Sequence, residues 1–116
     1  MTPRRILFVI AHPPRRGALA LETLDQLLVG AAFDQKISVL FMGDGVYQLV
    51  SSVEAFDNIA RGYRALPTYD VDDIYVDKTA IARRGLSKDT LVLPARALTR
   101  RGIQSLIAAH DVVVPD

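Results

Sequence analysis

The stretch KISVLFMGDGVYQLV, residues 36–50, carries the local pattern that decides the fold. Its first half is an apolar, β-branched run, which predicts a buried strand over Lys36–Met42. The turn Gly43-Asp44-Gly45 interrupts the run, and the apolar pattern that follows predicts a short helix over residues 45–50. A strand that leads through a glycine-rich turn directly into a helix is typical of α/β folds, in which such turns often face ligands.

The rest of the chain repeats this alternation. Further strands are predicted over Arg5–Ala11, Asp73–Val76, Asp89–Leu93 and Val112–Val114. Further helices are predicted over residues 18–31, 52–66 and 79–84, and in a last helix with Ile103, Leu106 and Ile107 on one face. We expect Thr99 to cap that last helix and Gly85 to end the helix over residues 79–84. Strands separated by helices pair in parallel, so the sequence predicts one domain over residues 1–116, an α/β/α sandwich in three layers around a five-stranded parallel sheet.

The composition limits what such a domain does. Half of the 116 residues are apolar, so we expect partner subunits to bury part of the apolar surface. The balance of 14 basic and 13 acidic residues gives no electrostatic reason for tight binding of nucleic acid. No apolar run reaches the roughly 18 residues of a membrane span. The apolar stretch after Arg5 is short and lacks a cleavage site for a signal peptide, so we expect a cytoplasmic protein without membrane contact.

Cysteine is absent, and His12 and His110 are the two histidines. Disulfides, thiolate catalysis and thiolate metal sites are therefore excluded for this chain. The histidines do not form a His-x-x-x-His pair, so a structural zinc site is not expected either.

Polar side chains follow several predicted strands. His12, Asp44 and Asp77 each come directly after a strand, which places them at the carboxyl edge of the sheet, where ligands bind in parallel sheets. We expect the start of the last helix at the same edge, with Arg96, Arg100 and Arg101. The opposite edge is expected to hold Arg4, Arg5, Lys36, Arg83, Arg84 and His110. Cations at helix C-termini there would complement the helix dipole.

Each residue of the carboxyl edge also has a purely structural interpretation. Asp44 is suited to N-cap the short helix, with Gly43 and Gly45 supplying the freedom of a tight turn. His12 precedes a proline and has no evident orienting partner, which favours a turn role. Asp77 is suited to cap the helix that begins near Thr79.

Three enzyme classes find no convincing catalytic set in this sequence. A dinucleotide or flavin site needs amide donors after the first strand, but the loop HPPRRG over residues 12–17 contains two prolines. A receiver-type phospho-acceptor domain needs acidic residues in that loop, and a hydrolase needs a Gly-x-Ser-x-Gly turn. Neither feature is present, so we expect no phosphate-bearing cofactor and no metal.

Three stretches of the chain resemble the DsrF/TusC family of DsrE/DsrF-like sulfur-relay proteins. These are LVGAAFDQKISVLFMGDGVYQL over residues 28–49, ALPTYDVDDIYVD over residues 65–77 and ARRGLSKDTLVLP over residues 82–94. The segment FMGDGVYQL, Phe41–Leu49, is the most specific of them. The resemblance runs from the first strand to Val112–Val114 and so covers almost the whole chain.

The resemblance implies a subunit of a cytoplasmic sulfur-relay complex. Members of this family assemble into a heterohexamer with TusB/DsrH-like and TusD/DsrE-like siblings. In the TusBCD branch, persulfide sulfur passes, directly or through a downstream sulfur carrier, to a tRNA-thiolating enzyme that makes 2-thiouridine at the wobble position. In the DsrEFH branch, the same architecture serves the oxidation of stored sulfur. The sequence does not separate the two branches.

The resemblance also assigns a role to one position. The persulfide-carrying cysteine of the TusD/DsrE-like sibling lies eight residues before the glycine of an Arg-Arg-Gly turn, and counting back from Gly85 reaches Asp77. A carboxylate cannot carry a persulfide, so the resemblance implies a subunit that is not catalytic by itself.

The other residues expected at a pocket or an interface with the siblings are His12, Asp44, Gly45, Tyr47, Gln48, Arg100 and Arg101. In this interpretation the Asp-Gly turn serves as scaffold and orients the short helix after it. A small-molecule-binding α/β enzyme that uses His12, Asp44 and Asp77 is the alternative from another class.

Overall fold

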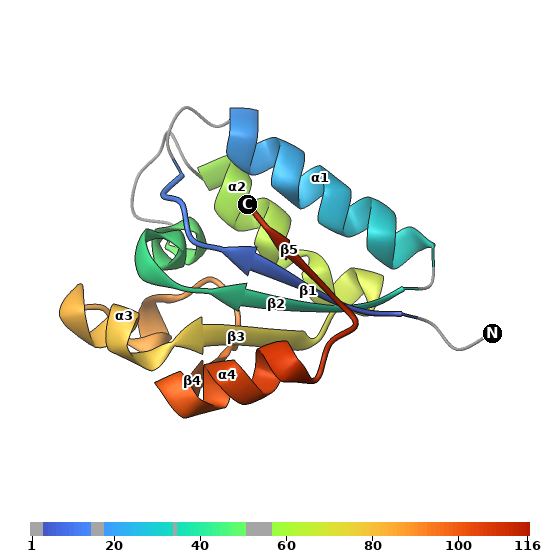
Figure 1. Cartoon of the computed structure of the whole chain (residues 1–116). Helices are drawn as coiled ribbons and strands as arrows, with labels where there is room; N and C mark the ends of the chain where they lie inside the picture. The colour runs from blue at the N-terminus through green and yellow to red at the C-terminus, as the bar shows by residue number, and fades with distance from the viewer. Residues whose placement is uncertain (1–3, 15–17, 34, 51–56) are drawn as a thin grey trace.

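The computed structural model describes residues 4–14, 18–33, 35–50 and 57–116. Its centre is a five-stranded sheet in the order β4-β3-β2-β1-β5, in which every pair of neighbours is parallel (Figure 1). The strands are β1 (Arg5–Ile10), β2 (Lys36–Phe41), β3 (Asp73–Asp77), β4 (Arg96–Leu98) and β5 (Val112–Pro115).

Helices cover both faces of this sheet. Figure 1 shows α1 (Ala18–Ala32) and α2 (Asp57–Arg64) on one side of the strands and α4 (Arg100–Ala108) on the other. The short helix α3 (Lys78–Arg83) follows β3 at its carboxyl end. Three 3₁₀ helices complete the described elements: η1 (Gly43–Leu49), η3 (Leu66–Tyr69) and η4 (Lys88–Thr90). The predicted α/β/α arrangement with a parallel sheet is confirmed.

Alternating side chains of the central strands build two cores, because successive residues of a strand point to opposite faces. The larger core lies under α1 and α2, where the rings of Phe41 and Tyr63 meet edge to face with centroids 5.0 Å apart. The smaller core lies under α4 and consists of Leu7, Leu40 and Ile103. The central strands are therefore buried on both sides, which explains their continuous apolar sequences.

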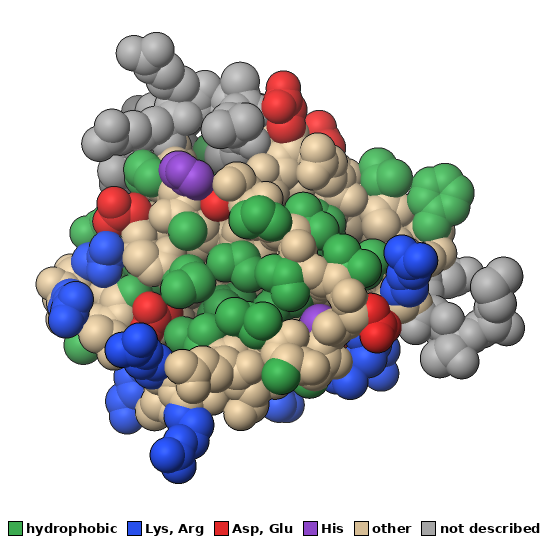
Figure 2. Space-filling model, in the orientation of Figure 1, with side chains coloured by type: hydrophobic (Ala, Val, Ile, Leu, Met, Phe, Trp, Pro, Cys, Tyr) green, Lys and Arg blue, Asp and Glu red, His purple; other side chains and the backbone are tan. Residues whose placement is uncertain are grey.

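The smaller core leaves apolar side chains at the surface. Figure 2 shows them gathered on the face between α4 and the central strands. Val9 of β1 and Leu106 of α4 are half-buried there. Val113 of β5, which pairs with Leu7, is 39% exposed, and Ile107 of α4 is 40% exposed. The single helix α4 therefore covers this face incompletely.

Two helix ends have the predicted caps. Thr99 accepts a hydrogen bond from the Gly102 amide at 3.2 Å and so caps α4. After α3, Gly85 adopts a φ of 63°, and the amides of Gly85 and Leu86 donate to the carbonyls of Ala82 and Ile81. This is the Schellman pattern, in which a glycine takes the left-handed conformation just beyond the helix.

The predicted fourth strand over Asp89–Leu93 is wrong. Its first residues belong to the 3₁₀ helix η4, and Leu91 forms only an isolated antiparallel bridge with Val50. The apolar side chains that suggested a strand instead fill the core under α1 and α2. The true fourth strand, β4, has three residues and pairs on one side only, so it is too short to show a period in the sequence.

The other differences concern helix bounds. The short helix predicted over residues 45–50 is a 3₁₀ helix that begins two residues earlier, at Gly43. The helix predicted over residues 52–66 is seen as α2 over Asp57–Arg64, and residues 52–56 of that prediction lie outside the described residues. Among the described residues, no helix has the length and apolar character needed to cross a membrane.

Candidate functional site

Asp77 lies where β3 passes into α3. Its carboxylate accepts hydrogen bonds from the amides of Thr79 at 3.0 Å and Ala80 at 3.4 Å, so it caps α3 as predicted. Beside it is an open pocket of about 350 Å³, lined by Met42, Asp77, Thr79, Arg100, Ile103 and Gln104. A helix N-terminus favours negative charge. The start of α3 therefore stabilises the Asp77 carboxylate and would also stabilise a thiolate at the same position.

Of the three arginines predicted at this edge, Arg100 and Arg101 lie in the first turn of α4. The prediction for Arg96 is wrong, because Arg96 is the first residue of β4 and so lies at the amino end of that strand. Arg100 lines the Asp77 pocket, whereas Arg101 is exposed without being part of that lining. The sequence therefore located Arg100 correctly relative to Asp77.

Asp44 does not cap the helix that follows it. The N-cap residue of η1 is Met42, which makes no side-chain cap hydrogen bond, and Asp44 belongs to the first turn. Its carboxylate accepts hydrogen bonds from Arg84 Nη2 at 2.8 Å and Nε at 3.1 Å, and the Arg84 guanidinium lies 6.0 Å from the ring centre of Tyr47. The predicted N-cap is wrong because the 3₁₀ helix begins before Asp44.

Arg84 was expected at the opposite edge of the sheet and is also misplaced. The helix α3 has only six residues, so its C-terminus stays near the carboxyl edge instead of crossing the sheet. Because the Asp44 side chain is 55% exposed, the ion pair contributes at most about 1 kcal/mol.

Gly45 is required for close packing. A Cβ atom on Gly45 would lie 1.9 Å from the carbonyl oxygen of Ile10, the last residue of β1. The absence of a side chain lets η1 pack directly on the end of the neighbouring strand. The buried Gln48, later in the same 3₁₀ helix, donates from Nε2 to the His12 carbonyl at 2.8 Å.

His12 has an orienting partner that sequence reasoning missed. Its Nδ1 lies 2.9 Å from Asp116 Oδ1, and the same carboxylate accepts the amides of Ala11 at 3.0 Å and His12 at 3.2 Å. The Asp116 side chain is 7% exposed, whereas that of His12 is 63% exposed. The turn role stays a prediction, but the reason given for it, the lack of an orienting partner, does not hold. The available signal was the fifth strand, whose parallel pairing would also bring Asp116 to the carboxyl edge.

Near His12 and Asp116, two buried polar atoms have no hydrogen-bond partner among the described residues. They are Gln48 Oε1 and the Tyr63 hydroxyl. Burial, and secondarily the negative charge of Asp116, raises the pKa of Tyr63 well above its ordinary value, so the hydroxyl stays protonated. The Tyr63 hydroxyl is thus a hydrogen-bond donor, and Gln48 Oε1 an acceptor, that the described residues leave unused.

The opposite edge of the sheet contains the other histidine. His110 Nδ1 lies 2.7 Å from the carbonyl of Leu106 near the end of α4, and Nε2 lies 2.9 Å from the hydroxyl of the buried Ser38. Both ring nitrogens of His110 therefore make contacts within the protein, which agrees with the structural role predicted for His110 at the edge where the helices end.

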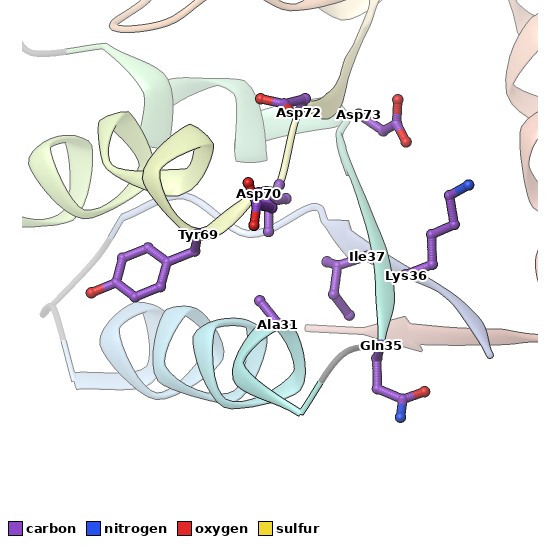
Figure 3. A pocket seen from close by; sticks show the side chains of 9 residues that line it. Ala31, Gln35, Lys36, Ile37, Tyr69, Asp70, Asp72 and Asp73 are labelled. Carbon is purple, nitrogen blue, oxygen red and sulfur yellow. The ribbon is translucent and has the colours of Figure 1, made fainter. Parts of the chain in front are cut away.

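A second pocket, of about 490 Å³, lies at the same amino edge between the end of α1 and the start of β3. Figure 3 shows Asp72 and Asp73 pointing in different directions, with Tyr69 to one side. The carboxylates do not converge, and the described residues contain no group of three or more His, Asp or Glu side chains able to hold a metal ion.

The comparisons with known proteins agree with this architecture. The model of the DsrE/DsrF-like family matches residues 4–115, and the chain belongs to that family.

Two relatives from the two branches of the family are similar to most of the chain. The chain is 39% identical over 93 residues to "Intracellular sulfur oxidation protein DsrF" of Allochromatium vinosum, covering 77% of this chain and 68% of the relative. It is 31% identical over 113 residues to "Protein TusC homolog" of Pseudomonas aeruginosa, covering 94% and 95%. The solved ychN protein from E. coli has the same fold, with a TM-score of 0.83 at 17% identity over 97% of this chain and 99% of that chain.

Proposed function

We propose that this chain is a subunit of a cytoplasmic sulfur-relay complex and is not catalytic by itself. Its partners are TusB/DsrH-like and TusD/DsrE-like siblings in a heterohexamer, and the complex supports 2-thiouridine synthesis in tRNA. The observation that carries the proposal is the match of nearly the whole chain to the DsrE/DsrF-like family and to a TusC homolog, combined with the absence of cysteine.

The Asp77 corner supports the same proposal. By the resemblance, a sulfur-carrying sibling has its cysteine at this position, after the third strand. Here the place is taken by a carboxylate that caps a helix and borders an open pocket. The scaffold of a sulfur carrier is therefore present without its nucleophile, as expected of a chain whose siblings carry the sulfur.

The incompletely covered face of the sheet supplies a surface for the siblings. Its exposed residues Val113 and Ile107 lie on β5 and α4, beside the half-buried Val9. Monomeric proteins rarely leave contiguous apolar surface of this kind in water. We assign this face to contact with a sibling of the same fold.

A DsrF-type role in sulfur oxidation is the second candidate. It is favoured by the higher identity, 39%, to the Allochromatium protein, although that match covers a smaller part of both chains. Neighbouring genes separate the two roles: genes of a sulfite-reductase system favour oxidation, and their absence favours tRNA thiolation.

Co-expression tests the proposed assembly. The chain, produced with its two genomic siblings, should elute from size-exclusion chromatography as one complex that contains all three proteins. Deleting its gene should then lower 2-thiouridine in total tRNA. Separate elution of the three proteins would contradict the proposal. A monomer that carries a bound nucleotide or chromophore would instead favour the small-molecule enzyme.

A further inference from the structure

The strand order of the sheet reverses between β1 and β5. From β1, the chain adds β2, β3 and β4 to one side, and the connection through α4 then places β5 on the other side of β1 (Figure 1). Ligands of open parallel sheets bind beyond the carboxyl ends of the strands at such a reversal. The residues close to these two strand ends are His12, beyond β1, and Asp116, directly after β5.

Asp116 fixes the imidazole of His12 in one orientation. The buried carboxylate accepts Nδ1–H at 2.9 Å and is itself held by two backbone amides, of Ala11 and His12. An ionised carboxylate only accepts hydrogen bonds, so Nδ1 carries the proton and Nε2 keeps its lone pair. Nε2 has no partner within the described part of the chain, and the His12 side chain is 63% exposed. A carboxylate that orients an imidazole in this way prepares it for proton transfer.

We infer that His12 Nε2 transfers the proton of a thiol that another protein of the relay presents at this edge; the inference rests on the proposed function. The acceptor thiol gives its S–H proton to Nε2, and the resulting thiolate attacks the outer sulfur of a donor persulfide. The S–S bond of the donor breaks as the new S–S bond forms, and the departing thiolate takes the proton back from the imidazolium. No net oxidation or reduction occurs, and the imidazole is regenerated.

A thiol is the group that suits this imidazole. Thiols and imidazolium ions are acids of similar strength, so a proton can move between them in both directions. The chain contains no cysteine, so both sulfurs must come from other proteins. The groups around His12 are compatible with the reversible charge. Asp116 would pair with the imidazolium. Tyr63, on which the charge of Asp116 also acts, stays neutral because burial raises its pKa.

The test uses the assembled complex, with one sibling loaded as persulfide and single-turnover transfer measured to an acceptor thiol. His12→Ala should slow transfer about 100-fold, the usual contribution of general acid–base catalysis. Free imidazole in the buffer should restore part of the rate, because the side chain is exposed. His12→Gln should lose the fall in rate that the parent shows when imidazole becomes protonated at acid pH. His110→Gln, which removes the other imidazole at the opposite edge, is the matched control and should keep the parental rate.

The outcomes separate the two proposals. An intact complex in which His12→Ala and His12→Gln transfer sulfur at the parental rate overturns the role of His12 and leaves the sulfur-relay function standing. Slow transfer that imidazole does not restore, with an unchanged pH profile, shows a structural role for His12 and also overturns the inference. If the parental chain forms no complex with its siblings, the proposed function fails, and the inference fails with it.

Discussion

At the scale of the residue, Asp77 caps a helix and also occupies the position where we expect a sulfur carrier in a sibling. Its carboxylate satisfies two amides at the start of α3. We propose that the same position corresponds to the sulfur carrier of a sibling. A carboxylate at the N-terminus of a helix is stabilised by the exposed amides and by the dipole. The same features would lower the pKa of a thiol placed there.

Asp77 variants test both roles. Asp77→Ala should reduce the free energy of unfolding by about 1–2 kcal/mol, the usual loss of a helix cap, and should leave sulfur transfer by the complex within a few-fold of the parent. Asp77→Cys should gain the mass of one sulfur atom when a persulfide donor is supplied. Asp44→Cys, a single thiol at an exposed place on the same edge, is the control and should be labelled more slowly. Loss of transfer by an assembled Asp77→Ala complex would show an active role for the carboxylate.

Tyr63 gives the protein an alkaline dependence of stability. In the unfolded chain its hydroxyl ionises near pH ~10. In the folded chain its pKa is raised by burial and by Asp116, so it remains protonated. Above that pH only the unfolded state gains free energy from ionisation, so the contribution of Tyr63 to stability is full below pH ~10 and is lost as pH rises further.

Tyr63→Phe should remove much of this alkaline loss. Its free energy of unfolding at neutral pH should equal or exceed that of the parent, because the hydroxyl is buried without a described partner. Urea denaturation at pH 7 and pH 11 measures both effects. Tyr69→Phe, at a residue that is 48% exposed, leaves Tyr63 in place and should keep the parental loss of stability between the two pH values. A clear loss of stability in Tyr63→Phe at pH 7 would mean that the hydroxyl has a hydrogen-bond partner after all.

At the scale of the element, η1 is held by the contact of its backbone with the end of β1. Gly45 permits that contact because any Cβ would overlap the Ile10 carbonyl. Gly85 has a different requirement: its φ is positive, but a Cβ there would meet no atom within 4 Å. One glycine is needed for space and the other for conformation.

These two glycines predict alanine variants of different severity. Gly45→Ala should destabilise the chain by about 2–3 kcal/mol, because η1 must move away from β1. Gly85→Ala should cost about 1 kcal/mol, the strain of a left-handed alanine. Thermal or urea unfolding followed by circular dichroism measures both. Equal losses in the two variants would show that η1 adapts to the added methyl group and that the close contact is not required.

At the scale of the whole molecule, we expect partners to bind the face of the sheet that the helices cover less completely. Two helices, α1 and α2, cover one face, and the single helix α4 covers part of the other. The apolar side chains that remain beside α4 are expected to be buried when the complex forms.

Val113→Glu tests this surface. Because Val113 is already 39% exposed, the isolated variant should fold with nearly parental stability, but the buried charge should prevent assembly with the siblings. Size-exclusion chromatography of co-expressed proteins measures the loss. Val29→Glu, at an exposed position of α1 on the other face, should assemble normally. Normal assembly of Val113→Glu would place the siblings on another surface.

The sequence by itself determined the features that depend on neighbours along the chain. The apolar runs of β1 and β2, the caps at Thr99 and Asp77 and the left-handed turn at Gly85 all follow from local periodicity and local hydrogen bonding. These features were enough to predict a parallel sheet between helices and to place Asp77 and Arg100 at one edge.

Only the tertiary structure decided which distant residues meet. The strand order, and with it the pairing of β5 beside β1, depends on how the helices pack, so nothing near His12 in the sequence indicates Asp116 as its partner. The ion pair of Asp44 with Arg84 depends in the same way on the shortness of α3. A three-residue strand such as β4 exists only because its neighbour β3 supplies the hydrogen bonds, and a local pattern cannot reveal it.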